Sequence, residues 1–87
     1  MKLIGRNHLQ LISGIDPEID RWLCAWVSEI LNARWKTHHD VVGQYPSVTY
    51  RDDGVFWFPV ALKRGRVETV FGFQHGIALI TSVSESR

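Results

Sequence analysis

The sequence predicts an α+β domain in which N-terminal helices pack on one face of a small antiparallel sheet. Two observations support this expectation. Segments with helical periodicity come before three consecutive strand-like segments, and no alternation of strands with helices is present. The strand-like segments lie between residues 55 and 83 and are separated by glycine-containing turns, which is the usual pattern of an antiparallel meander.

The composition fits a single folded domain, residues 1–87. Hydrophobic residues make up 45% of the chain and aromatic residues 11%, which suffices for one packed core. The formal net charge is +1, so any binding to nucleic acid must rest on a local patch. Cys24 is the single cysteine, which excludes a disulfide framework and a cysteine-based zinc site. With no apolar run of about 18 residues and an N-terminal segment too short for a signal peptide, we expect a cytoplasmic protein with no membrane partner.

Each strand of the expected meander has its own pattern. Val55–Leu62 is an almost continuous apolar run, and Pro59 within it lacks an N–H donor, which predicts an edge position or a bulge. Arg66–Phe73 alternates between two faces, and Ile77–Val83 is rich in β-branched residues. The face of the second strand expected to be buried carries Val67, Thr69, Phe71 and Phe73.

Before the meander, the sequence predicts a short strand, a helical turn and a long helix. The strand is Lys2–Ile4, and the turn is His8–Ser13 with Asn7 as its cap. The long helix starts at Asp16-Pro17-Glu18, because Asp16 can accept hydrogen bonds from free N–H groups and proline suits the first helical position. Its expected buried stripe is Ile19, Trp22, Leu23, Trp26, Val27, Ile30 and Leu31.

A second, shorter helix is expected to start after Thr37. Thr37 can act as its cap while Asp40 reaches back to the backbone, as in a capping box. Pro46 ends this helix, and Ser47–Arg51 then forms a short strand that leads into the meander. The expected inner face of the helix is Val41, Val42 and Tyr45.

The first turn of the meander concentrates positive charge. Lys63, Arg64 and Arg66 lie together with no acidic residue among them, and Arg51 or Lys36 could join them. Guanidinium groups offer a fork of donors that suits phosphate oxygens. If the chain binds an anion, this corner is the first candidate site. The alternative interpretation is a polar hairpin turn, in which cations are common.

The histidines and tryptophans give weaker indications. His75 lies in the second turn of the meander, where an imidazole can carry a proton near neutral pH, although a solvated turn residue is the alternative role. His38 and His39 are adjacent and expected to point in different directions, so they predict no metal site, and no cofactor motif is present. The tryptophans expected on inner faces are Trp22, Trp26 and Trp57.

The helical half of the chain contains a further pattern. Its residues are Ala25-Trp26, Glu29, Ala33, Trp35-Lys36-Thr37, Asp40, Gln44-Tyr45 and Ser47. Together with the opening Met-Lys-Leu-Ile and the pair Arg66-Val67, this pattern resembles the signature of the HigB-type toxins of bacterial toxin–antitoxin pairs, from residue 1 to about residue 83. The resemblance implies the RelE/ParE-like fold, in which helices lie on one side of a small antiparallel sheet.

The resemblance also implies a function. HigB-type toxins are mRNA interferases, metal-free endoribonucleases and thus hydrolases, which cut translated, ribosome-bound mRNA and are neutralised by a helix-turn-helix antitoxin protein. Such an enzyme needs a base for the ribose 2′-hydroxyl, cations for the phosphorane and an acid for the leaving oxygen. Arg66 matches the arginine of the family's strand, and Lys36 matches its WKT lysine. The expected catalytic residues are Arg66, Lys63 and His75, and the expected RNA-binding residues are Arg64, Lys36 and Arg51.

The sequence departs from the family pattern after the last strand. Family members continue with a His-x-Glu-Tyr segment that supplies groups at the site, whereas here Val83 is followed by Ser-Glu-Ser-Arg. Two expectations therefore stay open. Either His75 or Tyr50 serves in acid–base work, or the protein is a non-catalytic toxin-fold module that binds an antitoxin, a phage factor or a host factor. A ParE-like gyrase inhibitor would share the fold but not the helix signature.

Overall fold

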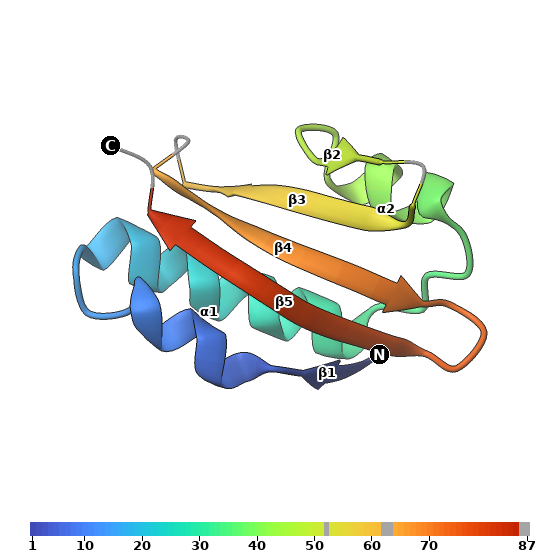
Figure 1. The fold of residues 1–87 in the computed structure, drawn as a ribbon, viewed down its shortest axis with the longest axis horizontal. Coiled ribbons are helices and arrows are strands. Elements are labelled where there is room, and N and C mark those ends of the chain that lie inside the picture. Colours follow the sequence, from blue (N-terminus) through green and yellow to red (C-terminus); the bar gives the residue numbers. More distant parts are fainter. Residues whose placement is uncertain (52, 62–63, 86–87) are drawn as a thin grey trace.

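The protein is built on a five-stranded sheet (Figure 1). The structure, a computed structural model, describes residues 1–51, 53–61 and 64–85. The strand order across the sheet is β1-β5-β4-β3-β2. The strands are β1 (Lys2–Ile4), β2 (Thr49–Tyr50), β3 (Val55–Val60), β4 (Gly65–Gly72) and β5 (Ile77–Glu85).

Three helical segments accompany this sheet in the described residues: the 3-10 helix η1 (Arg6–Leu11), α1 (Pro17–Asn32) and α2 (His38–Gln44). The predicted α+β class is therefore confirmed. No helix within the described ranges has the length and apolar character needed to cross a membrane.

The predicted antiparallel sheet is only partly correct. Strands β2 to β5 form the expected antiparallel meander, but β1 pairs in parallel with β5. The sheet is therefore mixed. Sequence patterns identify strands but not their neighbours, and here the first and last strands of the described chain lie side by side.

The start of α1 follows the predicted local chemistry. The Asp16 carboxylate accepts a hydrogen bond from the Glu18 backbone N–H at 2.8 Å, and Pro17 occupies the first turn. The buried stripe is narrower than predicted, because Leu31 is 45% exposed. The buried residues of the helix are Ile19, Leu23, Trp26 and Ile30.

The end of α1 is held by the N-terminal ammonium of Met1. This group donates hydrogen bonds to the carbonyl oxygens of Ile30, Leu31 and Ala33 at 3.0–3.2 Å. The last turn of α1 has no basic side chain. The ammonium therefore supplies the positive charge that the negative end of a helix dipole favours, and it ties the start of β1 to α1.

The predicted capping box of α2 is present. The Asp40 carboxylate accepts hydrogen bonds from the backbone N–H groups of Lys36 at 2.8 Å and Thr37 at 3.2 Å. The predicted inner face is correct for Val41, which is fully buried, while Val42 is 38% exposed. Tyr45, the C-terminal cap of α2, also faces inward as predicted, because it is partly buried and its ring lies 5.2 Å from that of Phe58.

The predicted start of the first helical turn is wrong. The turn begins at Arg6, and its N-terminal cap is Gly5 rather than Asn7. Gly5 has a φ of +88°, and a Cβ there would lie 2.6 Å from the carbonyl oxygen of Ile80. Only glycine combines this backbone conformation with so close an approach to β5, so tertiary contact decides the boundary.

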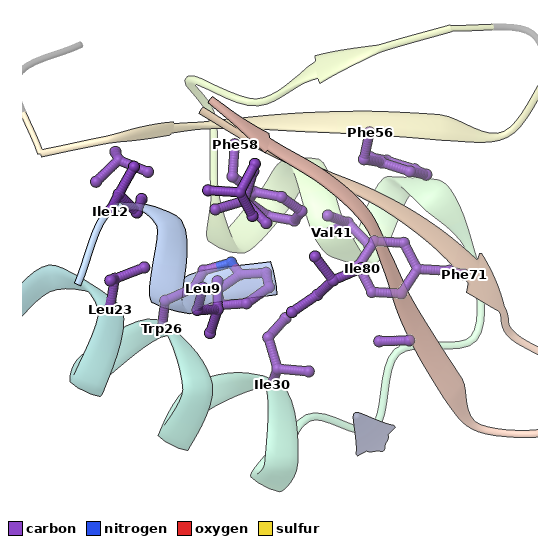
Figure 2. Packing of buried hydrophobic residues seen from close by; sticks show 14 of the residues in the cluster. Leu9, Ile12, Leu23, Trp26, Ile30, Val41, Phe56, Phe58, Phe71 and Ile80 are labelled. Carbon is purple, nitrogen blue, oxygen red and sulfur yellow. The ribbon is translucent and has the colours of Figure 1, made fainter. Parts of the chain in front are cut away.

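The core lies between the helices and the inner face of the sheet (Figure 2). Trp26 of α1 makes an edge contact with Phe58 of β3, with ring centroids 5.4 Å apart. Phe71 of β4 contacts Phe56 of β3 at 5.1 Å in the same manner. Alternation along β4 buries Val67, Thr69 and Phe71, as predicted. The opposite, outer face of the sheet is covered by no helix of the described chain.

Pro59 occupies an edge position, as predicted. It pairs with Arg66 on β4, but β2 pairs with β3 only at Phe56 and Trp57. On the β2 side, the backbone beyond Trp57 is therefore open. Proline has no N–H to leave unpaired there, so Pro59 protects the open end of β3 from pairing with another strand.

The two helix caps predict acid sensitivity of the fold. Hydrogen bonds from backbone N–H groups lower the pKa values of Asp16 and Asp40 below the ordinary aspartate value of 3.8. Because the pKa values of the two carboxylates are lowered in the folded state, the carboxylates contribute their full stabilisation above pH about 4. This stabilisation is lost as the pH falls through the folded-state pKa values. We expect the thermal midpoint to drop over that acidic range, and to drop less in an Asp16→Asn, Asp40→Asn variant. An equal drop in the variant would contradict this.

Candidate functional site

Trp57 lies on the outer face of the sheet, and its predicted inward orientation is wrong. The inner residues of β3 are Phe56, Phe58 and Val60, each completely buried, and alternation places Trp57 on the other side. The apolar run that forms β3 has no polar residues to mark its outer face, so the sequence did not reveal the orientation. The result is a half-buried tryptophan on an uncovered sheet surface.

Two arginines flank the Trp57 ring. The guanidinium carbon of Arg66 lies 4.5 Å from the ring centroid, and that of Arg51 lies 5.6 Å from it. Arg66 is opposite Pro59 on β4, whereas the backbone N–H of Arg51 bonds to the carbonyl of Val55. The two guanidinium groups therefore approach Trp57 from opposite ends of β3, and each is attracted to the ring.

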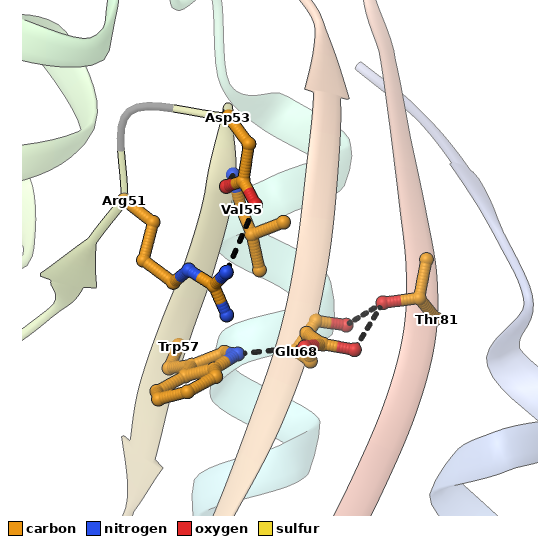
Figure 3. Close-up of polar contacts among 6 residues, drawn as sticks. All are labelled: Arg51, Asp53, Val55, Trp57, Glu68 and Thr81. Carbon is orange, nitrogen blue, oxygen red and sulfur yellow. Dashed lines mark hydrogen bonds and ion pairs between the residues drawn. The ribbon is translucent and has the colours of Figure 1, made fainter.

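Glu68 of β4 lies beside Trp57 of β3 (Figure 3). The Trp57 indole Nε1–H donates a hydrogen bond to Glu68 Oε1 at 2.8 Å, and the Thr81 hydroxyl donates one to Glu68 Oε2 at 2.8 Å. Both carboxylate oxygens are therefore held in place. Hydrogen bonds from Trp57 and Thr81, and the charges of Arg51 and Arg66, lower the pKa of Glu68 below the ordinary glutamate range.

A β-bulge in β5 brings Thr81 to Glu68. Glu68 pairs with Ser82, but the next residue of β4, Thr69, pairs with Ile80, so Thr81 is an extra residue without a partner in register. Ile80 and Val83 are buried, whereas Thr81 and Ser82 are both exposed. The bulge thus puts two consecutive hydroxyl groups on the outer face, and bulges next to active sites commonly redirect side chains in this way.

The outer-face cluster, by which we mean Arg51, Trp57, Arg66, Glu68 and Thr81, borders a small hollow. The hollow has a volume of about 100 Å³ and is lined by Trp57, Arg66, Glu68, Ser82 and Ser84. Arg66 also directs its Nε–H toward the Ser84 hydroxyl at 3.4 Å. The hollow therefore combines a permanent cation, an ionised carboxylate, an aromatic ring and hydroxyl groups.

The cations predicted to form one basic corner at the first turn of the meander have different partners in the structure. Arg64 forms ion pairs with Asp16 at 2.6 Å and Glu18 at 3.6 Å, at the start of α1, so acidic residues distant in sequence neutralise part of the corner. Arg66 instead belongs to the outer-face cluster. Lys63, the third member, lies outside the described residues. Of the expected RNA-binding residues, only Arg51 accompanies Arg66.

His75 and Tyr50 lie away from Arg66. Arg66 lies six residues before the end of β4, which is about 20 Å along the strand, and His75 lies beyond that end, in the turn after β4. Tyr50 pairs with Phe56 and stacks on His38, which places it on the inner side of β2. Neither residue lines the hollow that Arg66 lines.

Lys36 is exposed between α1 and α2. Its neighbour Trp35 packs on Phe71, toward the end of β4 that leads to His75. The side chains of His38 and His39 do not diverge as predicted, because their rings lie 4.1 Å apart and His38 stacks on Tyr50. Among the described residues, no group of three or more histidine, cysteine or carboxylate side chains is placed to hold a metal ion.

Sequence reasoning missed Glu68, Trp57 and Thr81 as members of the site. The alternation of β4 could have identified Glu68, because it places Glu68 on the same face as Arg66. No sequence signal marks the bulge that brings Thr81 to Glu68.

The sequence was compared with known proteins. A scan against protein-family models matches none, and a search of curated proteins finds no match.

Proposed function

We propose that this chain is a HigB-type toxin of a type II toxin–antitoxin pair, with the RelE/ParE-like fold, and that it cuts translated mRNA as an endoribonuclease. Its substrate is ribosome-bound mRNA in the cytoplasm, and its protein partner is a helix-turn-helix antitoxin. The helix signature between residues 25 and 47 motivates the family assignment. The arrangement of helices on a single face of the sheet is compatible with it.

The observation that supports RNA cleavage best is the outer-face cluster. An open sheet surface with two arginines around a half-buried aromatic ring suits single-stranded nucleic acid, because guanidinium groups bind phosphate and an aromatic ring can stack a base. Arg66 matches the family's strand arginine and lines the hollow. In the proposed reaction its guanidinium stabilises the negative charge that develops on the scissile phosphate.

A second candidate function is a non-catalytic module of the same fold that binds a protein partner. One observation favours it. Ile4 of β1 is opposite Leu79 of β5, and these side chains are 40% and 39% exposed on the outer face. Val70 extends this apolar strip on β4. Apolar side chains grouped on an uncovered sheet are typical of protein interfaces.

A cleavage assay on translating ribosomes distinguishes the two functions. The purified protein is added to ribosomes programmed with a defined mRNA, and new 5′ ends are detected by primer extension. We expect ends within the translated region, and fewer ends when the helix-turn-helix protein encoded beside the toxin is added. If the mRNA stays intact while circular dichroism shows folded protein, cleavage is rejected and the binding module becomes the better account.

A further inference from the structure

We propose that Glu68 is the general base of the cleavage reaction, held in its reactive position by Trp57 and Thr81. This inference rests on the proposed endoribonuclease function and adds a residue that the toxin signature does not contain. In this proposal Glu68 is the general base, a role that His75 and Tyr50 cannot fill because both lie away from the hollow that Arg66 lines.

The position of Glu68 relative to Arg66 motivates the assignment. The two residues are separated by one residue on β4, so their side chains emerge from the same face about 7 Å apart at the backbone, and both line the hollow. Cleavage of RNA needs a cation at the phosphate and a base at the neighbouring 2′-hydroxyl. A nucleotide whose phosphate binds Arg66 therefore has its ribose within reach of Glu68.

Three features suit Glu68 to proton removal. Its carboxylate is ionised at neutral pH, since the contacts from Trp57, Thr81 and the two arginines favour the charged form. Each oxygen accepts one hydrogen bond and keeps a further acceptor position for a substrate hydroxyl. The bulge at Thr81 provides one of these bonds, and it fixes the carboxylate without filling the hollow.

The proposed step balances without a cofactor. The Glu68 carboxylate accepts the proton of the ribose 2′-hydroxyl, and the 2′-oxygen forms a bond to phosphorus. The bond between phosphorus and the 5′-oxygen breaks, and that oxygen takes a proton from solvent water. The upstream fragment ends in a 2′,3′-cyclic phosphate and the downstream fragment begins with a 5′-hydroxyl.

The side chains that face Glu68 come from its own strand and from the neighbouring strands. Arg66 lies on the same strand, and Arg51 approaches from the end of β2. From β5, the facing side chains are the hydroxyl groups of Thr81 and Ser82. Within the described chain, no histidine or second carboxylate contacts Glu68, so one group controls the pH dependence of the base.

The test is single-turnover cleavage on programmed ribosomes, compared between the wild type and Glu68→Gln. Glutamine keeps the size of glutamate but cannot accept the proton. Its amide oxygen can accept the hydrogen bond from Trp57, and its NH2 group can donate to the Thr81 hydroxyl, which reverses the direction of that bond. We expect the rate constant at neutral pH to fall about 10²–10⁴-fold, with binding to a 2′-deoxy, uncleavable substrate unchanged. Between about pH 6 and about pH 8.5 the wild-type rate should stay flat, whereas the variant rate should rise about tenfold per pH unit as hydroxide replaces the base.

A matched control is Glu29→Gln, which removes a hydrogen-bonded carboxylate on α1, where Glu29 accepts from the Tyr45 hydroxyl. This variant should retain the wild-type rate and pH profile. A Glu68→Gln variant that cleaves at the wild-type rate, or one with a reduced rate but a flat pH profile, would overturn the assignment while leaving the proposed function in place. A wild type that does not cleave would reject both.

Discussion

Replacing Arg66 with alanine should reduce mRNA cleavage about 10²–10³-fold, the usual loss when one donor to a developing oxyanion is removed. Arg66 is exposed, lines the hollow and lies over Trp57, so its guanidinium is available to a phosphate on the open sheet face. The rate constant is measured by single-turnover cleavage on programmed ribosomes. Under the proposed function the loss should fall mainly on this rate constant, because Arg51, which pairs with Asp53 at 3.2 Å but remains exposed, still offers a guanidinium at the same surface.

Two variants provide controls for Arg66→Ala. Arg66→Lys keeps the charge but not the fork of donors, so it should recover only part of the rate. Arg21→Ala removes an exposed arginine from α1, on the opposite side of the sheet, and should leave the rate unchanged. Arg66→Ala should remain folded, because its contact with Trp57 contributes only about 0.5–1 kcal/mol at an exposed site. Wild-type cleavage by Arg66→Ala would remove Arg66 from the reaction.

Replacing Trp26 with alanine should lower the free energy of unfolding by about 3–5 kcal/mol. Trp26 is 1% exposed and contacts both Trp22 and Phe58, so its loss opens a cavity between α1 and the sheet. Small domains are stable by only about 5–15 kcal/mol, so the variant should be near its unfolding threshold at 37 °C. Urea unfolding followed by circular dichroism measures the change.

Trp22 and a conservative substitution complete the comparison. Trp22→Ala removes the same side chain one turn earlier in α1, where it is only half-buried, and should cost clearly less than Trp26→Ala. Trp26→Phe should also cost less than Trp26→Ala, because a smaller aromatic ring still fills part of the site and the buried indole Nε1, which has no hydrogen-bond partner, is removed. Equal losses for Trp22→Ala and Trp26→Ala would contradict the described core.

Local sequence signals predicted the helix starts of α1 and α2 well. The caps at Asp16 and Thr37 depend on backbone N–H groups two or three residues away, so the chain carries the whole signal in one short segment. The same holds for the alternation of β4, whose inner face was predicted correctly. Gly5 shows the limit of this reasoning, because its role depends on the approach of β5 from the far end of the chain.

The candidate site was predicted less completely, because most of its geometry comes from strand pairing. Arg66 and Arg51 were identified by charge and by resemblance, but their meeting at Trp57 requires the register of β2, β3 and β4. The apolar run of β3 could not indicate which face holds Trp57. The contact between Thr81 and Glu68 depends on a bulge that only the pairing of β4 with β5 defines.

The parallel pairing of β1 with β5 and the ion pairs of Arg64 have the same origin. Both contacts join segments that are distant in sequence, and no local sequence pattern indicates which segments will meet. The basic corner seemed free of acidic residues because Asp16 and Glu18 lie about 50 residues earlier in the chain. Charge clusters read from sequence therefore need the tertiary structure before they become candidate binding sites.

The most direct test of the proposed function is a map of mRNA 5′ ends in bacteria after brief induction of the wild type and, in parallel, of Arg66→Ala. We predict new ends within translated regions in wild-type cells, with 5′-hydroxyl groups, and their loss in cells that express the folded variant at the same level. New ends that persist in the variant would place the chemistry away from the outer-face cluster. No new ends in either culture would contradict mRNA cleavage itself.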